Sequence, residues 1–356
     1  MSDFLVIGGG IAGISAAARL SELGSVTVLE AEDALGYHAT GRSAAIFLPD
    51  YGNDVVRALN YASFDYLDGS GLLSPREMML LAKPDEREAF DTEVPSFNMS
   101  EISLDAAAEK FPILNKSTVG YAAIRAGIYD LDTDLMVQGF AKAARENGAE
   151  IVTDARVSRV EKSGARWRVT SDMGEFEGKT LVNATGAWAD HVAGLAGITA
   201  LGIQPYRRSF AQLAAPGGHD VTGWPFVDGV GEAWYAKPSA GKLLVSPSEE
   251  DPMDPFDAYA DDMVLAEGLA RYQEMVTEPV TRPETTWAGL RSFAPDRALV
   301  LGRDINEPDF IWCAGQGGYG FQTAAAASAL LADLIAGRIP ELYPVIVKAL
   351  SPDRFA

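Results

Sequence analysis

The 356-residue sequence is poor in cysteine, in histidine and in positive charge. Its single cysteine, Cys313, excludes an internal disulfide and favours a reducing compartment. The three histidines, His38, His191 and His219, lack the spacing of metal ligands, and we expect no metal site. The net charge of −21 argues against nucleic acid and anionic lipid as partners, because both would be repelled.

Long apolar segments are missing as well. No stretch reaches the roughly 18 apolar residues of a membrane span, so we expect no transmembrane segment. The apolar run Phe4–Ile7 meets glycines at once and follows no basic segment, which is unlike a signal peptide. We therefore expect a soluble, cytoplasmic protein of about two domains that acts on a small molecule.

A glycine motif follows the first expected strand. Gly8, Gly10 and Gly13 form G-x-G-x-x-G, and Glu30 ends the next expected strand roughly 20 residues later. The first glycine permits a tight turn, the second lets backbone amides approach a pyrophosphate, and the third lets helix and strand pack closely. The Glu30 carboxylate would accept hydrogen bonds from ribose hydroxyls. The pattern predicts dinucleotide binding, and the alternative is a glycine-rich turn of some other α/β protein.

Apolar periodicity predicts an α/β chain around this motif. The expected strands are 4–7, 26–29, 180–184 and 310–314. The expected helices are 11–23, with Gly24 as C-cap, 131–147, with Asp132 or Asp134 near its start, and 321–334. Residues 150–176, 201–250 and 279–295 look β-rich, and the acidic segment 249–262 is expected to be a solvated loop.

The stretch GYHATGRSAA follows the second expected strand. A nicotinamide enzyme would usually continue into another βα unit, whereas this chain continues through small residues and hydrogen-bond donors. Small side chains let a backbone lie against a flat, extended cofactor, and Arg42 and Ser43 can bond its phosphate or ring. A flexible surface loop is the alternative.

Seven motifs between residues 6 and 323 together resemble one family. They are VIGGGIAG, GYHATGRSAA, LLSPREM, VNATGAWAD, QPYRRS, TWAGLRSF and AGQGGYGFQT. The chain resembles the FAD-dependent glycine oxidase and D-amino acid oxidase superfamily, and within it the bacterial D-arginine dehydrogenases. The resemblance implies an α/β, two-domain fold: a Rossmann-like FAD domain (1–50, 131–204 and 297–356) and an interleaved, mixed β-sheet substrate domain (51–130 and 205–296).

The resemblance also implies which residues contact FAD. They are Gly8, Gly10, Ile11, Ala12, Gly13, Glu30, Ala39, Thr40, Gly41, Arg42, Ser43, Ala44, Ala45, Val157, Gly186, Trp188, Gly317, Gly318, Tyr319, Gly320, Gln322 and Thr323. Some relatives hold their flavin covalently, but Cys313 lies in the buried-looking strand FIWCA and is expected to be a packed core thiol. We therefore expect noncovalent FAD.

Arginines are the natural clamps for a substrate carboxylate. Arg291 lies among apolar residues, and the resemblance gives it this role; a structural ion pair is the alternative. Arg207 and Arg208 should point to opposite faces of a strand, and the alignment favours Arg208 in the pocket. Tyr235 resembles a carboxylate-binding tyrosine or is a core aromatic. Gly318 would offer its carbonyl to the substrate amine.

Two further residues are expected near the substrate side chain. In the D-arginine enzymes the glutamate that matches Glu77 faces the guanidinium of the substrate; the alternative is a surface glutamate bonded to Arg76. Tyr51 matches a tyrosine on the loop that covers the substrate. Ile46 departs from the family, which has a histidine there, and this makes the pocket more apolar and puts arginine preference in doubt.

The expected activity is oxidative deamination of D-amino acids, with D-arginine and D-lysine or a broader set as substrates. Hydride transfer from Cα to flavin N5 would yield an imino acid, which water hydrolyses to a 2-oxo acid and ammonia. The sequence does not specify the electron acceptor. The alternatives are an oxygen-using oxidase of glycine or sarcosine, a tRNA-modifying flavoprotein, which the acidic charge disfavours, and a non-catalytic flavin-binding subunit.

Overall fold

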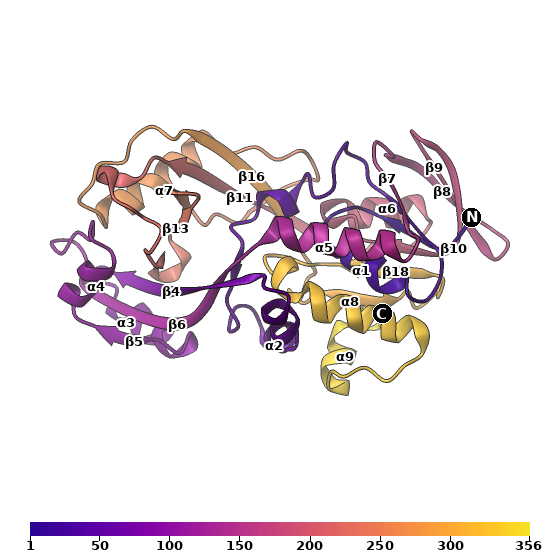
Figure 1. The fold of residues 1–356 in the computed structure, drawn as a ribbon, viewed down its shortest axis with the longest axis horizontal. Coiled ribbons are helices and arrows are strands. Elements are labelled where there is room, and N and C mark those ends of the chain that lie inside the picture. The colour runs from indigo at the N-terminus through magenta and orange to yellow at the C-terminus, as the bar shows by residue number, and fades with distance from the viewer.

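The computed structural model describes residues 1–356. Two β-sheets occupy opposite ends of the long axis, and helices α1, α5 and α8 lie against the first of them (Figure 1). The strands of the first sheet run in the order β17-β18-β10-β1-β2-β7, and β9 extends it from β10 with β8 at its edge. Their bounds are β1 Ser2–Ile7, β2 Val26–Leu29, β7 Glu150–Val152, β8 Val157–Ser163, β9 Arg166–Ser171, β10 Gly174–Asn183, β17 Val300–Arg303 and β18 Phe310–Ala314.

Helices cover one face of this sheet and mixed structure covers the other. The central strands pair in parallel, and such strands are buried on both faces. Val6 and Val28 pack with α1 (Ile11–Leu20), α5 (Thr133–Glu146) and α8 (Gly320–Ala336). Leu5 and Trp312 point the other way, toward α6 (Ala189–Leu195) and β9. Burial of each such side chain stabilises the fold by about 1.5–3 kcal/mol.

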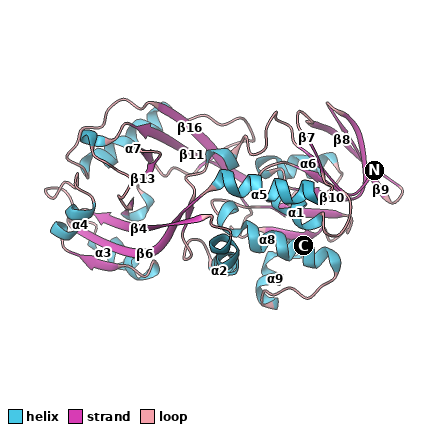
Figure 2. Ribbon diagram, viewed as in Figure 1, coloured by secondary structure: helices cyan, strands magenta, loops and turns pink.

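The second sheet has ten strands in the order β15-β11-β14-β13-β12-β4-β6-β3, with β16 beside β11 and β5 beside β6. Figure 2 shows it as the strand-rich end opposite the N-terminus. Its strands are β3 Ile46–Phe47, β4 Leu73–Ala82, β5 Ser100–Ile102, β6 Tyr121–Leu131, β11 Gln204–Leu213, β12 Phe226–Gly229, β13 Tyr235–Ser239, β14 Lys242–Ser246, β15 Asp251–Pro252 and β16 Thr285–Phe293.

The remaining helices lie outside the two sheets. The α-helices are α2 Asp54–Gly69, α3 Arg87–Ser96, α4 Leu104–Lys110, α7 Asp262–Glu274 and α9 Pro344–Leu350. The short 3-10 segments are η1 Ala39–Arg42, η2 Gly186–Trp188, η3 Pro216–Gly218, η4 Val230–Glu232 and η5 Pro352–Phe355. No helix has the length and apolarity that crossing a lipid bilayer requires.

Each sheet is assembled from separate stretches of chain. The first takes its strands from 2–29, 150–183 and 300–314, and the second from 46–131 and 204–293. We propose on this basis the interleaved division that the resemblance implies. Strand β3 departs from it, because it lies within 1–50 and pairs with β6 of the second sheet.

Two local predictions are wrong. Helix α1 ends at Leu20 with Ser21 as its C-cap, whereas the prediction extended it to Leu23 with Gly24 as C-cap; the amides of Leu23 (2.9 Å) and Gly24 (3.1 Å) both donate to the Leu20 carbonyl in a closing turn. The acidic segment 249–262 is not only a solvated loop. Its strand β15 pairs with β11, and the Asp261 side chain caps α7 through the amides of Met263 and Val264.

Candidate active site

The glycine motif occupies the turn from β1 to α1, where there is no room for side chains. Gly8 has a φ of +105°, and a Cβ there would lie 2.4 Å from the Ala184 carbonyl oxygen. A Cβ on Gly13 would lie 1.9 Å from the Gly8 carbonyl oxygen. The turn therefore brings the start of α1 against β10, and leaves its amides at the edge of a cavity.

Glu30 directly follows β2 and lies beside this turn. Its side chain is buried and accepts hydrogen bonds from the amides of Gly9 (2.6 Å) and Glu32 (3.0 Å). These bonds fix the carboxylate at the cavity wall, which is the position that the dinucleotide fingerprint predicts for a ribose-binding acid.

Segment η1 lies across the start of α1. The Thr40 hydroxyl accepts a hydrogen bond from the Ile11 amide (3.0 Å), and a Cβ on Gly10 would lie 3.1 Å from the same oxygen. Segment η1 also packs against β16 of the second sheet, where a Cβ on Gly289 would be in van der Waals contact with the Arg42 Cβ at 3.4 Å. The small residues in this stretch thus serve close packing around the cavity, and the stretch is not a free surface loop.

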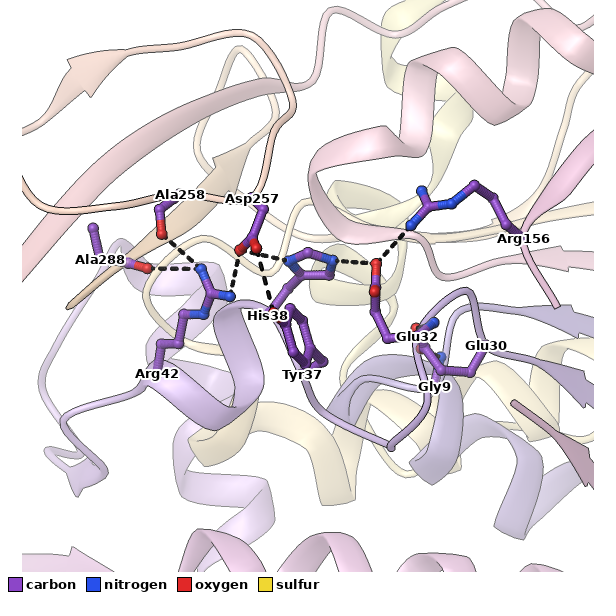
Figure 3. A network of polar contacts seen from close by, with 10 residues as sticks. All are labelled: Gly9, Glu30, Glu32, Tyr37, His38, Arg42, Arg156, Asp257, Ala258 and Ala288. Carbon is purple, nitrogen blue, oxygen red and sulfur yellow. Dashed lines mark hydrogen bonds and ion pairs between the residues drawn. The ribbon is translucent and has the colours of Figure 1, made fainter. Parts of the chain in front are cut away.

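Arg42 is held by the second sheet and a neighbouring loop (Figure 3). Its Nη2 pairs with Asp257 Oδ1 at 2.5 Å, and its Nη1 donates to the carbonyls of Ala258 (2.8 Å) and Ala288 (3.1 Å). Arg42 borders the cavity, but these bonds occupy its guanidinium. The sequence predicted that Arg42 contacts the phosphate or ring of the cofactor. It did not predict that Arg42 anchors this segment to Asp257, Ala258 and Ala288.

The same network continues to the far end of the cavity. His38 lies between Asp257 (3.8 Å) and Glu32 (3.0 Å), and Glu32 also pairs with Arg156 at 2.8 Å (Figure 3). His38, Glu32 and Arg156 border the cavity, and none of them was predicted from the sequence. They come from separate chain segments, so only the fold brings them together.

One continuous cavity runs from Glu30 and Val157 past Gly10 and Ala44 to Gly318. All residues expected to contact the cofactor line it except Gly13, Gly41, Ala45, Tyr319 and Thr323. Gln322 faces this space with its buried amide nitrogen unbonded, while its amide oxygen accepts from the Leu48 amide (3.1 Å). The close-packed glycines, the carboxylate at one end and the orphan donor at the other fit an extended dinucleotide.

Arg291 of β16 lies at the Gly318 end of this cavity. It forms no ion pair, and its only side-chain hydrogen bond is donated from Nη1 to the Tyr51 hydroxyl (3.3 Å). A Cβ on Gly318 would lie 3.2 Å from the Arg291 Cζ, so a larger residue there would press on this guanidinium. Burial raises the pKa of Tyr51, which keeps the phenol neutral and able to donate.

The pairing of β11 with β16 decides which arginine enters the cavity. Tyr206 lies opposite Arg291, and Arg208 lies two positions farther along β11, opposite Gly289, so Arg208 and Arg291 leave the sheet on one face. Arg208 lines the cavity, whereas Arg207 points to the other face and pairs with Asp251 at 2.8 Å. Of the two arginines, Arg208 is the one that borders the cavity, and its contact with a substrate stays a prediction.

Arg208 is already surrounded by acceptors. Its Nε donates to the Glu249 carbonyl (2.9 Å), and its Nη2 lies 3.5 Å from Glu250 and 4.0 Å from Glu232 without a hydrogen bond. Its Cζ lies 6.0 Å from the centre of the Tyr235 ring. Arg291 is therefore the cation of the cavity whose charge has no acidic partner.

Three comparisons with known proteins agree with this geometry. The model of the DAO family, described as FAD dependent oxidoreductase, matches residues 3–334. The chain belongs to this family. The fold class predicted from the sequence is confirmed, and FAD is the cofactor of the family.

Individual relatives are distant. The glycerol 3-phosphate dehydrogenase of Caloramator mitchellensis is 24% identical over 94% of this chain and 74% of its own length. The glycine oxidase of Bacillus licheniformis is 23% identical over 94% and 93%. The tRNA-modifying protein MnmC of Maricaulis maris is 28% identical over 99% of this chain, which spans only 55% of that relative.

Solved structures show the same fold. Glycine oxidase from Geobacillus kaustophilus superposes with a TM-score of 0.83 at 18% identity over 98% of both chains. L-proline dehydrogenase from P. horikoshii gives 0.82 at 24% identity over 99% of this chain and 97% of its own. Proteins with this fold carry names of different activities, so the fold alone does not identify the substrate of this oxidoreductase. The substrate must be inferred from the residues of its own site.

Glu77 does not face the cavity of this oxidoreductase. It pairs with Lys110 at 2.6 Å, with both side chains about two-fifths exposed (40% and 42%). The pairing of β4 with β6 is irregular between Arg76 and Met78, which directs Glu77 outward. Contact with a substrate side chain is thus a wrong prediction, and so is the Arg76 alternative, because Arg76 pairs with Asp130.

Lys237 of β13 is a residue that sequence analysis missed. Its Nζ donates to the carbonyls of Ala44 (2.6 Å) and Ala45 (3.0 Å), and pairs with Asp130 at 2.9 Å. Burial lowers the pKa of Lys237. Ala45 has a φ of +57°, and Lys237 holds this strained backbone beside the cavity.

The other predicted residues have clear positions. Ile46 lines the cavity, which makes this wall apolar. Tyr235 is buried on β13, packs against Phe210, and has an unbonded hydroxyl. Cys313 is packed in the core, and burial raises the pKa of its thiol to about 12, which makes a reactive thiolate scarce.

Proposed function

We propose that this chain is an FAD-dependent enzyme that oxidatively deaminates D-amino acids. The observation that carries the proposal is Arg291, a partly buried guanidinium with no acidic partner. The chain has 50 acidic residues against 29 Lys and Arg, so an arginine left free in a cavity is kept for another anion. A substrate carboxylate supplies that anion with matching bidentate geometry.

The neighbours of Arg291 fit the other groups of an amino acid. The neutral Tyr51 hydroxyl can donate a second hydrogen bond to the carboxylate, because Arg291 occupies its acceptor side. The backbone of Gly318 borders the same space and offers a carbonyl to the amine. Phe210 and Ile46 form an apolar wall that excludes water from the reacting carbon.

Bound FAD would supply the two-electron acceptor at this end of the cavity. The substrate must arrive with a neutral amine, since the nitrogen lone pair forms the C=N bond as hydride leaves Cα. Water then adds to the imino acid, giving a 2-oxo acid and ammonia. The protein contributes orientation, through the carboxylate clamp and the amine contact.

An oxidase of glycine or sarcosine is the second candidate. It is favoured by the outward position of Glu77 and by Ile46, which leave a pocket wall with less polar character. A tRNA substrate has no such support, because the net charge is −21.

The test uses enantiomer pairs and product analysis. The FAD-loaded protein is incubated with D- or L-leucine, D- or L-arginine, glycine or sarcosine, together with an artificial electron acceptor. The proposal predicts 2-oxo acid and ammonia in equal amounts from D-amino acids, and none from L-amino acids. Glyoxylate from glycine or sarcosine alone would favour the second candidate, and no product from any of them would overturn both.

A further inference from the structure

A buried carboxylate lies on the second sheet without a partner. Asp228 of β12 is only 8% exposed, and its Oδ1 accepts no hydrogen bond. It stands directly opposite Tyr235 in the antiparallel pairing of β12 with β13. The two side chains therefore leave the sheet on the same face.

That face leads to the cavity. Tyr235 packs against Phe210, with ring centres 6.0 Å apart, and lies 6.0 Å from the Arg208 Cζ. Phe210 and Arg208 both line the cavity. The ring of Phe226, two residues before Asp228, also packs against the Tyr235 ring, with ring centres 5.4 Å apart. Asp228 does not itself border the cavity; it lies beside the aromatic rings of Phe226 and Tyr235, and Tyr235 contacts the two lining residues Phe210 and Arg208.

Such a carboxylate is costly without a ligand. An unpaired charge in an apolar layer destabilises a fold by several kcal/mol, so proteins normally pair it or remove it. Burial, together with Glu232 and Glu93, raises the pKa of Asp228 well above its usual range, and Arg208 only partly opposes this. The Arg208 Nη2 and the Tyr235 hydroxyl are buried and unbonded as well.

The charge around this layer selects the kind of ligand. Arg208 is the cation that acts on Asp228, against the neighbouring acids Glu232 and Glu93, while Glu250, which also faces Arg208, is paired with Arg297 at 2.9 Å. A second carboxylate would be repelled there, whereas a cation would satisfy the surplus of acceptors. Arg291 leaves the second sheet on the same face as Arg208, but it forms no ion pair and stays available for the carboxylate of the substrate.

We propose that Asp228 recognises a positively charged group at the far end of the substrate side chain. This inference rests on the proposed function and names its substrate class: basic amino acids, held by the carboxylate at Arg291 and by the distal cation at Asp228. Asp228, and not Glu77, then sets the side-chain preference.

The kinetic test compares D-lysine with D-norleucine, which has a similar chain length but no terminal amine. The rate of flavin reduction without oxygen gives kcat/KM for the wild type, Asp228→Asn and the matched control Glu77→Gln. Asp228→Asn should lower kcat/KM for D-lysine by roughly 100-fold and leave D-norleucine nearly unchanged. Glu77→Gln should change neither. Unchanged D-norleucine turnover also shows that Asp228→Asn is folded.

A binding test needs no turnover. ε-Aminocaproate and caproate correspond to lysine and norleucine without the α-amine, so neither can be deaminated at Cα. Their dissociation constants follow from the change in the visible spectrum of bound flavin. The wild type should bind ε-aminocaproate more tightly, and Asp228→Asn should remove that preference.

The outcomes separate the two proposals. If the wild type oxidises no amino acid but binds ε-aminocaproate through Asp228, the proposed function fails and the cation site stands. If it oxidises D-norleucine as well as D-lysine, and Asp228→Asn changes neither, the function stands and the inference is overturned. Equal losses for both substrates would also overturn it, because they would indicate a structural role for Asp228.

Discussion

The two ends of the cavity satisfy their polar groups in different ways. At the nucleotide end, Glu30 binds the Gly9 amide and Thr40 binds the Ile11 amide, so the protein forms these contacts by itself. At the substrate end, the Arg208 Nη2 and the Tyr235 hydroxyl are buried without a hydrogen bond, and Arg291 has no counter-ion. The hydrogen bonds of the nucleotide end form within the protein, whereas those of the substrate end require a bound ligand.

This difference separates stability from activity. Polar atoms that are paired within the protein contribute to folding, and their loss destabilises the chain. Atoms left for a ligand cost stability in the free protein and act during binding. Changes at the nucleotide end should therefore release cofactor and lower stability, and changes at the substrate end should lower activity while the cofactor stays bound.

The largest effect is expected for Arg291→Met. It removes the charge that holds the substrate carboxylate, so kcat/KM should fall roughly 1000-fold while FAD content and Tm stay near wild type. Steady-state kinetics with a D-amino acid gives the first value, and flavin absorbance per protein gives the second. Arg207→Met is the control, since Arg207 points away from the cavity. If both variants lose equal activity, the assignment by sheet register is wrong.

Gly13→Ala tests the nucleotide end. Its Cβ would lie 1.9 Å from the Gly8 carbonyl oxygen, so the β1–α1 turn must shift, at a cost of about 3 kcal/mol. We expect protein that is purified without FAD and that unfolds at lower temperature. Gly139→Ala is the matched control, because a Cβ there meets nothing within 4 Å and should stabilise α5 by about 1 kcal/mol. Full FAD occupancy of Gly13→Ala would show that the close-packed β1–α1 turn is not needed to bind the cofactor.

Lys237→Met should combine a moderate loss of stability, as for variants of the nucleotide end, with a change at the bound cofactor. The variant loses the donors to the Ala44 and Ala45 carbonyls, while Asp130 keeps its pair with Arg76. We expect a loss of about 2 kcal/mol in the free energy of unfolding, measured with urea, and a shifted visible spectrum of bound flavin. An unchanged spectrum would show that Lys237 does not position the Ala44–Ala45 backbone beside the bound flavin.

The smallest effect is expected for Glu77→Gln. An exposed ion pair such as Glu77–Lys110 contributes only about 0–1 kcal/mol, and Glu77 does not border the cavity. Both kcat/KM and Tm should stay near wild type for basic and apolar substrates alike. A selective loss for basic substrates would return the selector role to Glu77.

The sequence predicted the nucleotide end well because its signals are local. Gly8, Gly10, Gly13 and Glu30 are spaced by one βα unit, and that spacing is visible in a single segment. Helix α5 was predictable for the same reason, since Asp132 caps its first turn.

The substrate end was predictable only in part, because strand register forms it. The alternation of Arg207 and Arg208 indicates that one of them enters the pocket. The irregular pairing that turns Glu77 outward has no signal in the sequence, because it depends on how β6 lies against β4. Asp228 meets Tyr235 only through the pairing of β12 with β13. Long-range contacts of this kind require the fold.

The most direct test of the account is a single anaerobic mixing experiment on the FAD-loaded protein. D-leucine and D-lysine are mixed in turn with the wild type and with Arg291→Met, and the main visible flavin band is followed in time. The account predicts rapid bleaching of the wild type and very slow bleaching of Arg291→Met at equal FAD content. Wild-type flavin that stays oxidised with every D-amino acid, or Arg291→Met that bleaches as fast as wild type, would contradict it.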